Sequence, residues 1–266
     1  MDKAPQFKGV YVDGLMKRAE ENGGQIYPGR DPAKPFQLII ELKEPDMREG
    51  KIPPWVVDQR TKENYLHSKR VDAYWTAIRQ TEELRTRFPN VQVVFSGGTP
   101  RHLAGTPDPL NWKVPQNVVY DISAGKGCAL PPEVDPRAPR LPSNPFDRTF
   151  AENFVILNAN WFECGDRNHD FKISDEEQQK LNDVVQRTHN LGLKVRLWGG
   201  PDGRLRSNAE MPGQFGPCHW PSPRGCSEAD KWAKWKAQQT AGVDYLNTNH
   251  LTNGSEWIRY CGRKPA

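Results

Sequence analysis

Long apolar runs, blocks of like charge and zinc-type cysteine pairs are all missing from this sequence. No stretch approaches the roughly 18 consecutive apolar residues that a membrane-spanning helix needs. The 37 basic and 33 acidic side chains are interleaved and leave a formal net charge of +4, so no basic patch points to nucleic acid. We therefore expect a chain that neither spans a membrane nor binds nucleic acid.

Cysteine is scarce, with 5 residues in 266, and their spacing excludes the CxxC pairs of zinc sites. An odd number of thiols cannot all pair within one chain. Cys218 and Cys226 flank a proline-rich loop and could close it as a disulfide in an oxidising compartment. The alternative is two ordinary surface thiols.

The chain has enough apolar residues to form a hydrophobic core, with 36% hydrophobic residues and 9 tryptophans. Six short runs rich in β-branched and aromatic residues recur, and near-continuous apolar character is typical of strands covered on both faces. They are QLIIELK at 37–43, VQVVFSGG at 91–98, VVYDIS at 118–123, NFVILNANW at 153–161, LKVRLWGG at 193–200 and VDYLNTNH at 243–250.

Helical periodicity separates several of these runs, and alternation of strand and helix predicts a parallel sheet. A helix over 12–19 precedes the first strand and ends at a glycine, as helices often do. The residues that share helical faces are Val71, Tyr74, Trp75 and Ile78, then Leu181, Val184, Val185 and Leu191, then Trp232 with Trp235.

A proline-rich segment, 128–145, separates the third and fourth runs. We interpret it as a surface loop within a single domain over 1–266, since neither half alone has enough alternating units for a balanced sheet. The alternative is an interdomain linker.

Polar residues end each predicted strand, where functional groups of parallel α/β proteins gather. Glu41 and Lys43 alternate along the first strand and point to the same side. The carboxylate could ligate a divalent cation and the ammonium a phosphate oxygen, or the two form an ion pair at the edge of the core. The other strands end in Ser96, Asp121, Asn158 with Asn160, Trp198, and Asn247 with Thr248 and Asn249, a set that suits a hydroxylated or phosphorylated ligand.

The order of four motifs, IIELK, VVFSGGTPR, HNLGLKVRLWGGPD and AGVDYLNTNHL, resembles phospholipase-C-like phosphodiesterases, in particular the altered-inheritance-of-mitochondria branch. The resemblance runs from about Phe7 to Leu251. It implies a (β/α)8 TIM-barrel fold, of which about six of eight strands are present, and a phosphoric diester hydrolase.

The resemblance also implies roles for the matching residues. Glu41 corresponds to a catalytic or metal-binding glutamate, for a divalent cation such as Ca²⁺ or Mg²⁺, and Lys43 to its companion base. The substrate-binding positions are Ser96, Asp121, Trp198, Asn247 and Thr248.

One part of the family pattern is missing. Such enzymes begin with a strand bearing an HNDY-type histidine motif, followed by a Glu-x-Asp strand and a His-Asp pair, and none of these precedes Phe7. The six histidines lie outside the matching motifs, so we expect none of them to act as the general acid or base. Two explanations remain open: a sequence that begins inside a longer enzyme, or a non-catalytic barrel that binds its ligand. Six strands of eight also leave open sheet edges, which predicts association with another chain.

The segment 166–177 carries a separate pattern. Oxygen-bearing side chains fall at positions 1, 3, 5, 9 and 12, as in a calcium loop. Phe171 replaces the usual glycine at position 6, and Ser174 with Glu177 also fits the capping box of a following helix. The alternatives are a calcium site made by Asp166, Asn168, Asp170, Ser174 and Glu177, or a capped surface turn.

The leading hypothesis is metal-assisted cleavage of a small-molecule or lipid-headgroup phosphodiester. The alternative is a binding protein with a calcium site, and a third reading, a glycan-binding barrel, conflicts with the core spacing of Trp232 and Trp235. The sequence start has no signal pattern. A missing N-terminal segment and a Cys218–Cys226 bridge would both be compatible with secretion.

Overall fold

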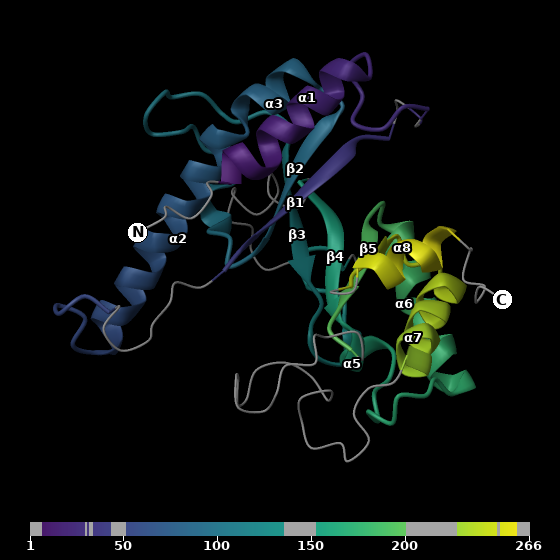
Figure 1. Ribbon diagram of the computed structural model, residues 1–266. Helices are drawn as coiled ribbons and strands as arrows, with labels where there is room; N and C mark the ends of the chain where they lie inside the picture. The colour runs from purple at the N-terminus through teal and green to yellow at the C-terminus, as the bar shows by residue number, and fades with distance from the viewer. Residues whose placement is uncertain are drawn as a thin grey trace. The chain divides into compact units, whose positions relative to one another are not determined.

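The computed structural model has an α/β fold whose strands form one parallel sheet (Figure 1). It describes residues 7–29, 31, 34–43, 52–135, 153–200, 228–248 and 251–259. The strands are β1 (Phe36–Leu42), β2 (Val91–Gly97), β3 (Val118–Ser123), β4 (Phe154–Asn160), β5 (Lys194–Trp198) and β6 (Tyr245–Leu246).

The strands follow one another across the six-stranded sheet in chain order, β1 to β6. Every pairing whose register is given, β1 with β2, β2 with β3, β4 with β5 and β5 with β6, is parallel. Parallel neighbours in chain order need a crossover between them, which fits the α/β prediction. The six strands are compatible with part of a TIM barrel.

The helices lie largely in the connections between these strands. They are the π-helix η1 (Lys8–Val12), α1 (Asp13–Glu21), α2 (Gln59–Gln80), α3 (Glu82–Arg87), the short 3-10 helices η2 (Arg101–Leu103) and η3 (Lys126–Cys128), α5 (Trp161–Cys164), α6 (Asp175–Asn190), α7 (Glu228–Ala241) and α8 (Leu251–Arg259). In the described part of the chain, no helix is both long and apolar enough to cross a membrane.

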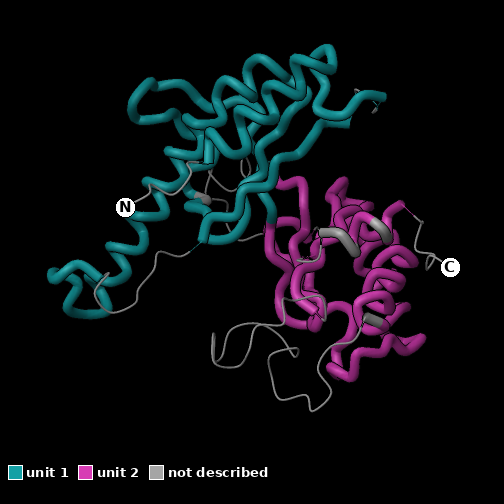
Figure 2. Tube along the Cα trace, in the orientation of Figure 1, with its two compact units in different colours: residues 1–121, 142–153 teal, residues 122–141, 154–266 magenta. Residues whose placement is uncertain are grey.

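The chain divides into two compact units, and the boundary falls inside β3 (Figure 2). Unit 1 comprises 1–121 and 142–153, and unit 2 comprises 122–141 and 154–266. Each unit is described by itself below.

Unit 1 has a core between α1, α3 and β2. The buried cluster consists of Val12, Met16, Ala19, Ile26, Leu84, Phe88 and Val91. Helix α1 ends as its sequence predicts: the Gly24 N–H donates to the Ala19 carbonyl at 2.7 Å, and Gly23 is left-handed, with φ of 64°. The predicted helix before the first strand is therefore confirmed.

Unit 2 packs α6 and α7 together beside β5. Leu181, Val184 and Val185 on α6 are buried, as the predicted apolar face requires. Trp235 on α7 is 1% exposed, and its ring centroid lies 5.9 Å from that of Trp257 on α8. Trp235 is thus a core residue, as expected.

Several predictions fall on residues that the structure does not describe. The proline-rich loop 128–145 is described only as far as 135, and Cys218, Cys226 and Asn249 all lie outside the described ranges. The Cys218–Cys226 disulfide therefore stays a prediction.

Candidate functional site

Two glycines hold the carboxyl ends of β1 and β2 close together. Gly97 has φ of 73°, and a Cβ built there would lie 2.8 Å from the Leu42 carbonyl oxygen. The Gly98 N–H donates to the same oxygen at 2.8 Å. A side chain at either position would crowd the end of β1, so glycine fixes the shape of this edge.

Glu41 and Lys43 lie at this edge and pair with each other. The Lys43 ammonium donates to Glu41 Oε1 at 2.5 Å, and the two side chains are 73% and 41% exposed, respectively. An ion pair this exposed contributes only about 0–1 kcal/mol to stability. The ion pair that the sequence analysis gave as one alternative is present, and both of its side chains are exposed.

Ser96 and Asp121 lie at the ends of β2 and β3, as expected, but both are buried. Ser96 is 1% exposed and lies opposite Glu41 in the parallel register. Asp121 is 4% exposed. The structure thus brings Glu41 and Ser96 together in unit 1 but places the serine and the aspartate inside it, where contact with a large ligand is limited.

A pair of histidines stands beside the same end of β2, and sequence reasoning missed it. The rings of His67 on α2 and His102 on η2 stack, with centroids 5.1 Å apart and planes inclined by 24°. Arg70, one turn after His67, reaches Gly98: its Nε would lie 3.4 Å from a Cβ there. Because the two histidines lie 35 positions apart, no local pattern signals their contact.

Desolvation of its ring, and then the charge of neighbouring His67, lower the pKa of His102 below its ordinary value. The imidazole is therefore neutral at neutral pH and able to accept a proton. We call Glu41, Lys43, His67, Arg70 and His102 the β1–β2 site.

The remaining expected ligand-binding residues belong to unit 2. Trp198 ends β5 and is 40% exposed. Asn247 and Thr248 follow β6 and are half-buried. Asn160, at the end of β4, is the N-cap of α5: its Oδ1 accepts a hydrogen bond from the Phe162 N–H at 3.0 Å.

The Asp166–Glu177 loop forms a closed turn. Asp166 is fully buried, and its two oxygens accept the N–H groups of Asp170 and Phe171, each at 3.0 Å. Glu177 accepts the Arg167 N–H with one oxygen and the Ser174 N–H with the other. The Ser174–Glu177 capping box is confirmed at the start of α6.

The carboxylates of this loop differ in their protonation. Burial raises the pKa of Asp166, against the effect of its two N–H donors. Burial would also raise the pKa of Glu177, but hydrogen bonds from Ser174 and from the Arg167 backbone hold it below its usual range. Ionised Glu177 is thus the stabilising member of the capping box.

Neither expected metal position fits a divalent cation as placed. The Glu41 carboxylate forms an ion pair with the Lys43 ammonium. The oxygens of Asp166 and Glu177 accept hydrogen bonds from backbone N–H groups. No cluster of three or more His, Cys, Asp or Glu side chains among the described residues is arranged to hold a metal ion. Calcium binding by the loop stays a prediction.

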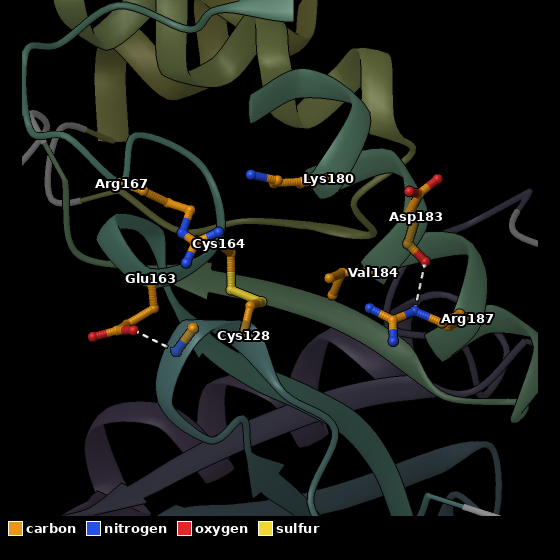
Figure 3. Close-up of a pocket in the computed structure, with 9 residues that line it drawn as sticks. Cys128, Glu163, Cys164, Arg167, Lys180, Asp183, Val184 and Arg187 are labelled. Carbon is orange, nitrogen blue, oxygen red and sulfur yellow. Dashed lines mark hydrogen bonds between the residues drawn. A yellow bond between two sulfur atoms is a disulfide. The ribbon is translucent and has the colours of Figure 1, made fainter. Parts of the chain in front are cut away.

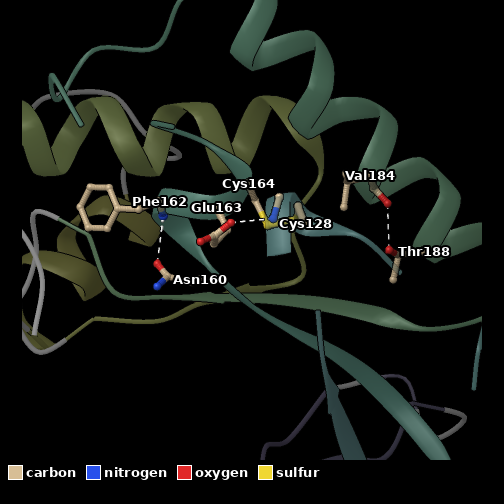
Figure 4. The surroundings of a disulfide bond; sticks show 8 residues. Cys128, Asn160, Phe162, Glu163, Cys164, Val184 and Thr188 are labelled. Atoms are coloured by element: carbon tan, nitrogen blue, oxygen red, sulfur yellow. Dashed lines mark hydrogen bonds between the residues drawn. A yellow bond between two sulfur atoms is a disulfide. The ribbon is translucent and has the colours of Figure 1, made fainter. Parts of the chain in front are cut away.

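A disulfide that the sequence did not predict joins Cys128 of η3 to Cys164 of α5 (Figure 3, Figure 4). Both cysteines are buried, and their Cα atoms lie 5.0 Å apart. Glu163 reinforces the junction by accepting the Gly127 N–H at 2.6 Å. The pairing depends on the fold, since 36 residues separate the two thiols.

Comparison with known proteins leaves the family open. No family model, no curated protein and no solved structure matches the chain.

Proposed function

We propose that the chain is a phosphoric diester hydrolase-type protein that acts at the β1–β2 site. The observation that carries the proposal is the stacked His67–His102 pair at the carboxyl end of β2. The η2 helix, which holds His102, begins four residues after β2 ends, and Arg70, one turn after His67, reaches Gly98. In parallel α/β proteins this is the edge where catalytic groups gather. The resemblance of the strand motifs to phospholipase-C-like phosphodiesterases gives the reaction class.

The side chains of the β1–β2 site supply complementary chemistry. This proposal revises the sequence-based expectation that no histidine acts as the general acid or base, because the stacked pair was not foreseen. Neutral His102 takes the proton of an attacking hydroxyl or water oxygen, which forms the new bond to phosphorus. His67, when protonated, returns a proton to the leaving oxygen as its bond to phosphorus breaks. Lys43 and Arg70 offset the negative charge on the remaining phosphoryl oxygens. With water as the attacking group, the net reaction converts a diester into a phosphate monoester and an alcohol. With a substrate hydroxyl, it gives a new diester and an alcohol.

Hydrolysis of a chromogenic phosphodiester by the purified chain tests this proposal. We expect His102→Ala to lower kcat/KM by about 100-fold or more, the range of general acid–base catalysis. His189→Ala in unit 2 and Glu63→Gln on the exposed part of α2 serve as matched controls and should retain activity. Circular dichroism establishes that each variant is folded.

Two outcomes would overturn the proposal: no turnover by folded wild-type chain, or full turnover by His102→Ala. Glu41→Gln tests whether the Glu41 carboxylate acts in the reaction or in substrate binding. If that variant loses turnover while binding a non-hydrolysable diester as before, the carboxylate acts in the reaction and not in binding.

The alternative function is a non-catalytic barrel that binds a phosphodiester headgroup. The observation that favours it is that the Glu41 carboxylate already accepts a hydrogen bond from Lys43, while Ser96 and Asp121 are buried. Calorimetric binding of a diester without turnover would support this function. A calcium titration in the same experiment, with Glu177→Gln as the comparison, tests the proposed loop ligand.

A further inference from the structure

A small pocket in unit 2 lies beside the Cys128–Cys164 disulfide and uses none of the residues of the β1–β2 site. Its volume is about 130 Å³. Three cationic side chains line it: Arg167, Lys180 and Arg187. Figure 3 shows Lys180 and Arg187 extending from α6 toward the disulfide, with Arg167 approaching from the other side. We call this the cationic pocket.

Within the described part of the chain, two of these cations form no ion pair as close as 4 Å, although the charge of Arg167 helps to lower the pKa of Glu176. Arg187 donates from Nε to the Asp183 carbonyl at 3.2 Å, which leaves its terminal nitrogens for other acceptors. The Arg167 guanidinium makes no ion pair with any described residue, and its NH2 would lie 3.6 Å from a Cβ at Gly127. Only Lys180 is paired, with Glu176 one turn earlier on the exposed side of α6.

Each of the two carboxylates that line the pocket has one oxygen that accepts a hydrogen bond from another donor. Glu163 accepts the Gly127 N–H, and Asp183 Oδ1 accepts from the Gln179 side chain at 2.8 Å. In Figure 3 the Asp183 carboxylate points away from Arg187, which donates only to the Asp183 backbone. Three cations thus face the pocket against two acidic side chains that are turned to other donors.

The size of the cationic pocket limits what it can hold. Pockets for drug-sized ligands measure roughly 300–1,000 Å³, so about 130 Å³ admits one small group. Guanidinium groups present a planar fork of N–H donors that matches the oxygens of phosphate, and they bind it with charge-assisted hydrogen bonds. A tetrahedral oxyanion has both the charge and the size that this pocket accepts.

We propose that the cationic pocket binds a phosphate group, held by Arg167 and Arg187 with Lys180 as a third charge. The phosphate is either free or carried on a larger molecule. A wider hollow of about 470 Å³ shares Arg167 and Lys180 with the cationic pocket and leaves room for the rest of such a ligand.

Calorimetric titration of the full chain with inorganic phosphate at low ionic strength tests the proposal. We expect Arg167→Gln and Arg187→Gln each to weaken phosphate binding about tenfold, and Lys180→Gln to weaken it less. Added sodium chloride should weaken binding by the wild-type chain as well. Arg60→Gln, on the exposed start of α2, is the matched control and should bind as the wild type does.

Sedimentation with vesicles containing phosphatidic acid distinguishes the source of the phosphate. Vesicle binding that is lost in Arg167→Gln assigns the pocket to a lipid headgroup, whereas phosphate binding without vesicle binding assigns it to a soluble ligand. All three cations are exposed, so these variants keep the fold, and circular dichroism checks this. Absence of phosphate binding, or binding that Arg167→Gln and Arg187→Gln leave unchanged, overturns the proposal.

Discussion

The β1–β2 site in unit 1 and the Asp166–Glu177 loop in unit 2 both gather polar side chains, yet they use them in opposite ways. In the loop, each oxygen of Asp166 and Glu177 accepts a backbone N–H. At the β1–β2 site, Glu41 pairs with exposed Lys43, and His67 stacks on His102. The polar side chains of the loop hydrogen-bond to the loop's own backbone, whereas Glu41 and Lys43 at the β1–β2 site are exposed to solvent.

This difference separates structural polar residues from candidate functional ones. A buried backbone N–H that loses its acceptor costs about 1–3 kcal/mol, so the loop carboxylates are needed for the fold. An exposed ion pair contributes far less. Substitutions should therefore affect stability in the loop and activity at the β1–β2 site.

The largest stability effect is expected at Asp166. Replacing it with alanine leaves the buried Phe171 N–H without its acceptor, whereas the Asp170 N–H keeps its second acceptor, Asn168 Oδ1, at 3.1 Å. We therefore expect Asp166→Ala to lower the free energy of unfolding by about 2–3 kcal/mol. Urea denaturation measures the change. Asp170→Ala, which removes an exposed acceptor for the Lys172 N–H, is the control and should cost less than half as much. Equal effects would contradict the structural role of Asp166.

The next effect concerns Gly97, which packs tightly against the end of β1 next to the β1–β2 site. Gly97→Ala must adopt a left-handed backbone and bring its Cβ within 2.8 Å of the Leu42 carbonyl, so we expect it to cost about 2–3 kcal/mol. Gly23→Ala has a similar φ of 64° and open space around it, so it isolates the backbone cost of about 1 kcal/mol. Thermal unfolding of both variants, side by side, checks the difference.

Two substitutions with smaller expected effects on stability compare the loop with the β1–β2 site directly. Ser174→Ala removes the N-cap of α6 and should cost about 1 kcal/mol. Glu41→Gln breaks the exposed pair with Lys43 and should change stability by less than about 0.5 kcal/mol. If chemical denaturation ranks these two in the reverse order, the contrast between loop and site fails.

The smallest effect concerns the pKa of His102. His67→Ala removes the neighbouring charge but not the desolvation of the ring, so the pKa of His102 should rise part of the way toward its ordinary value of about 6.5. Titration of the imidazole proton signals by NMR measures this. No change would mean that the stacked pair does not form in solution.

The same lowered pKa gives a stability effect with a definite sign. Because the unfolded chain takes up the proton first as the pH falls, stability is complete above the unfolded pKa and is lost as the pH falls through the lower folded pKa. His67→Ala should reduce this acid loss, which unfolding experiments at pH values falling below about 6.5 would detect.

Local sequence patterns were sufficient to predict most of the strands. The run VVYDIS matches β3 at both ends, and the runs at 37–43 and 91–98 match β1 and β2 to within one residue, because continuous β-branched character marks buried parallel strands. The last run, 243–250, gives only a two-residue strand, Tyr245–Leu246. Asn247 and Thr248, the described residues that follow, lie outside the strand.

The candidate site was predicted less well, for a physical reason. Strand ends such as Glu41 and Ser96 follow from periodicity, but burial does not, and Ser96 and Asp121 proved to be buried. The His67–His102 and Cys128–Cys164 contacts join residues far apart in the chain. Such contacts depend on how helices and loops pack, and no spacing rule encodes them.

The Cys128–Cys164 bridge makes the chain between these residues a covalent ring. A protease that cuts once anywhere from 129 to 163 opens the ring without separating its two ends. The nicked protein would migrate as one species on a non-reducing gel and as two fragments after reduction. The fold could thus survive a cleavage in the proline-rich segment that would divide a chain without the bridge.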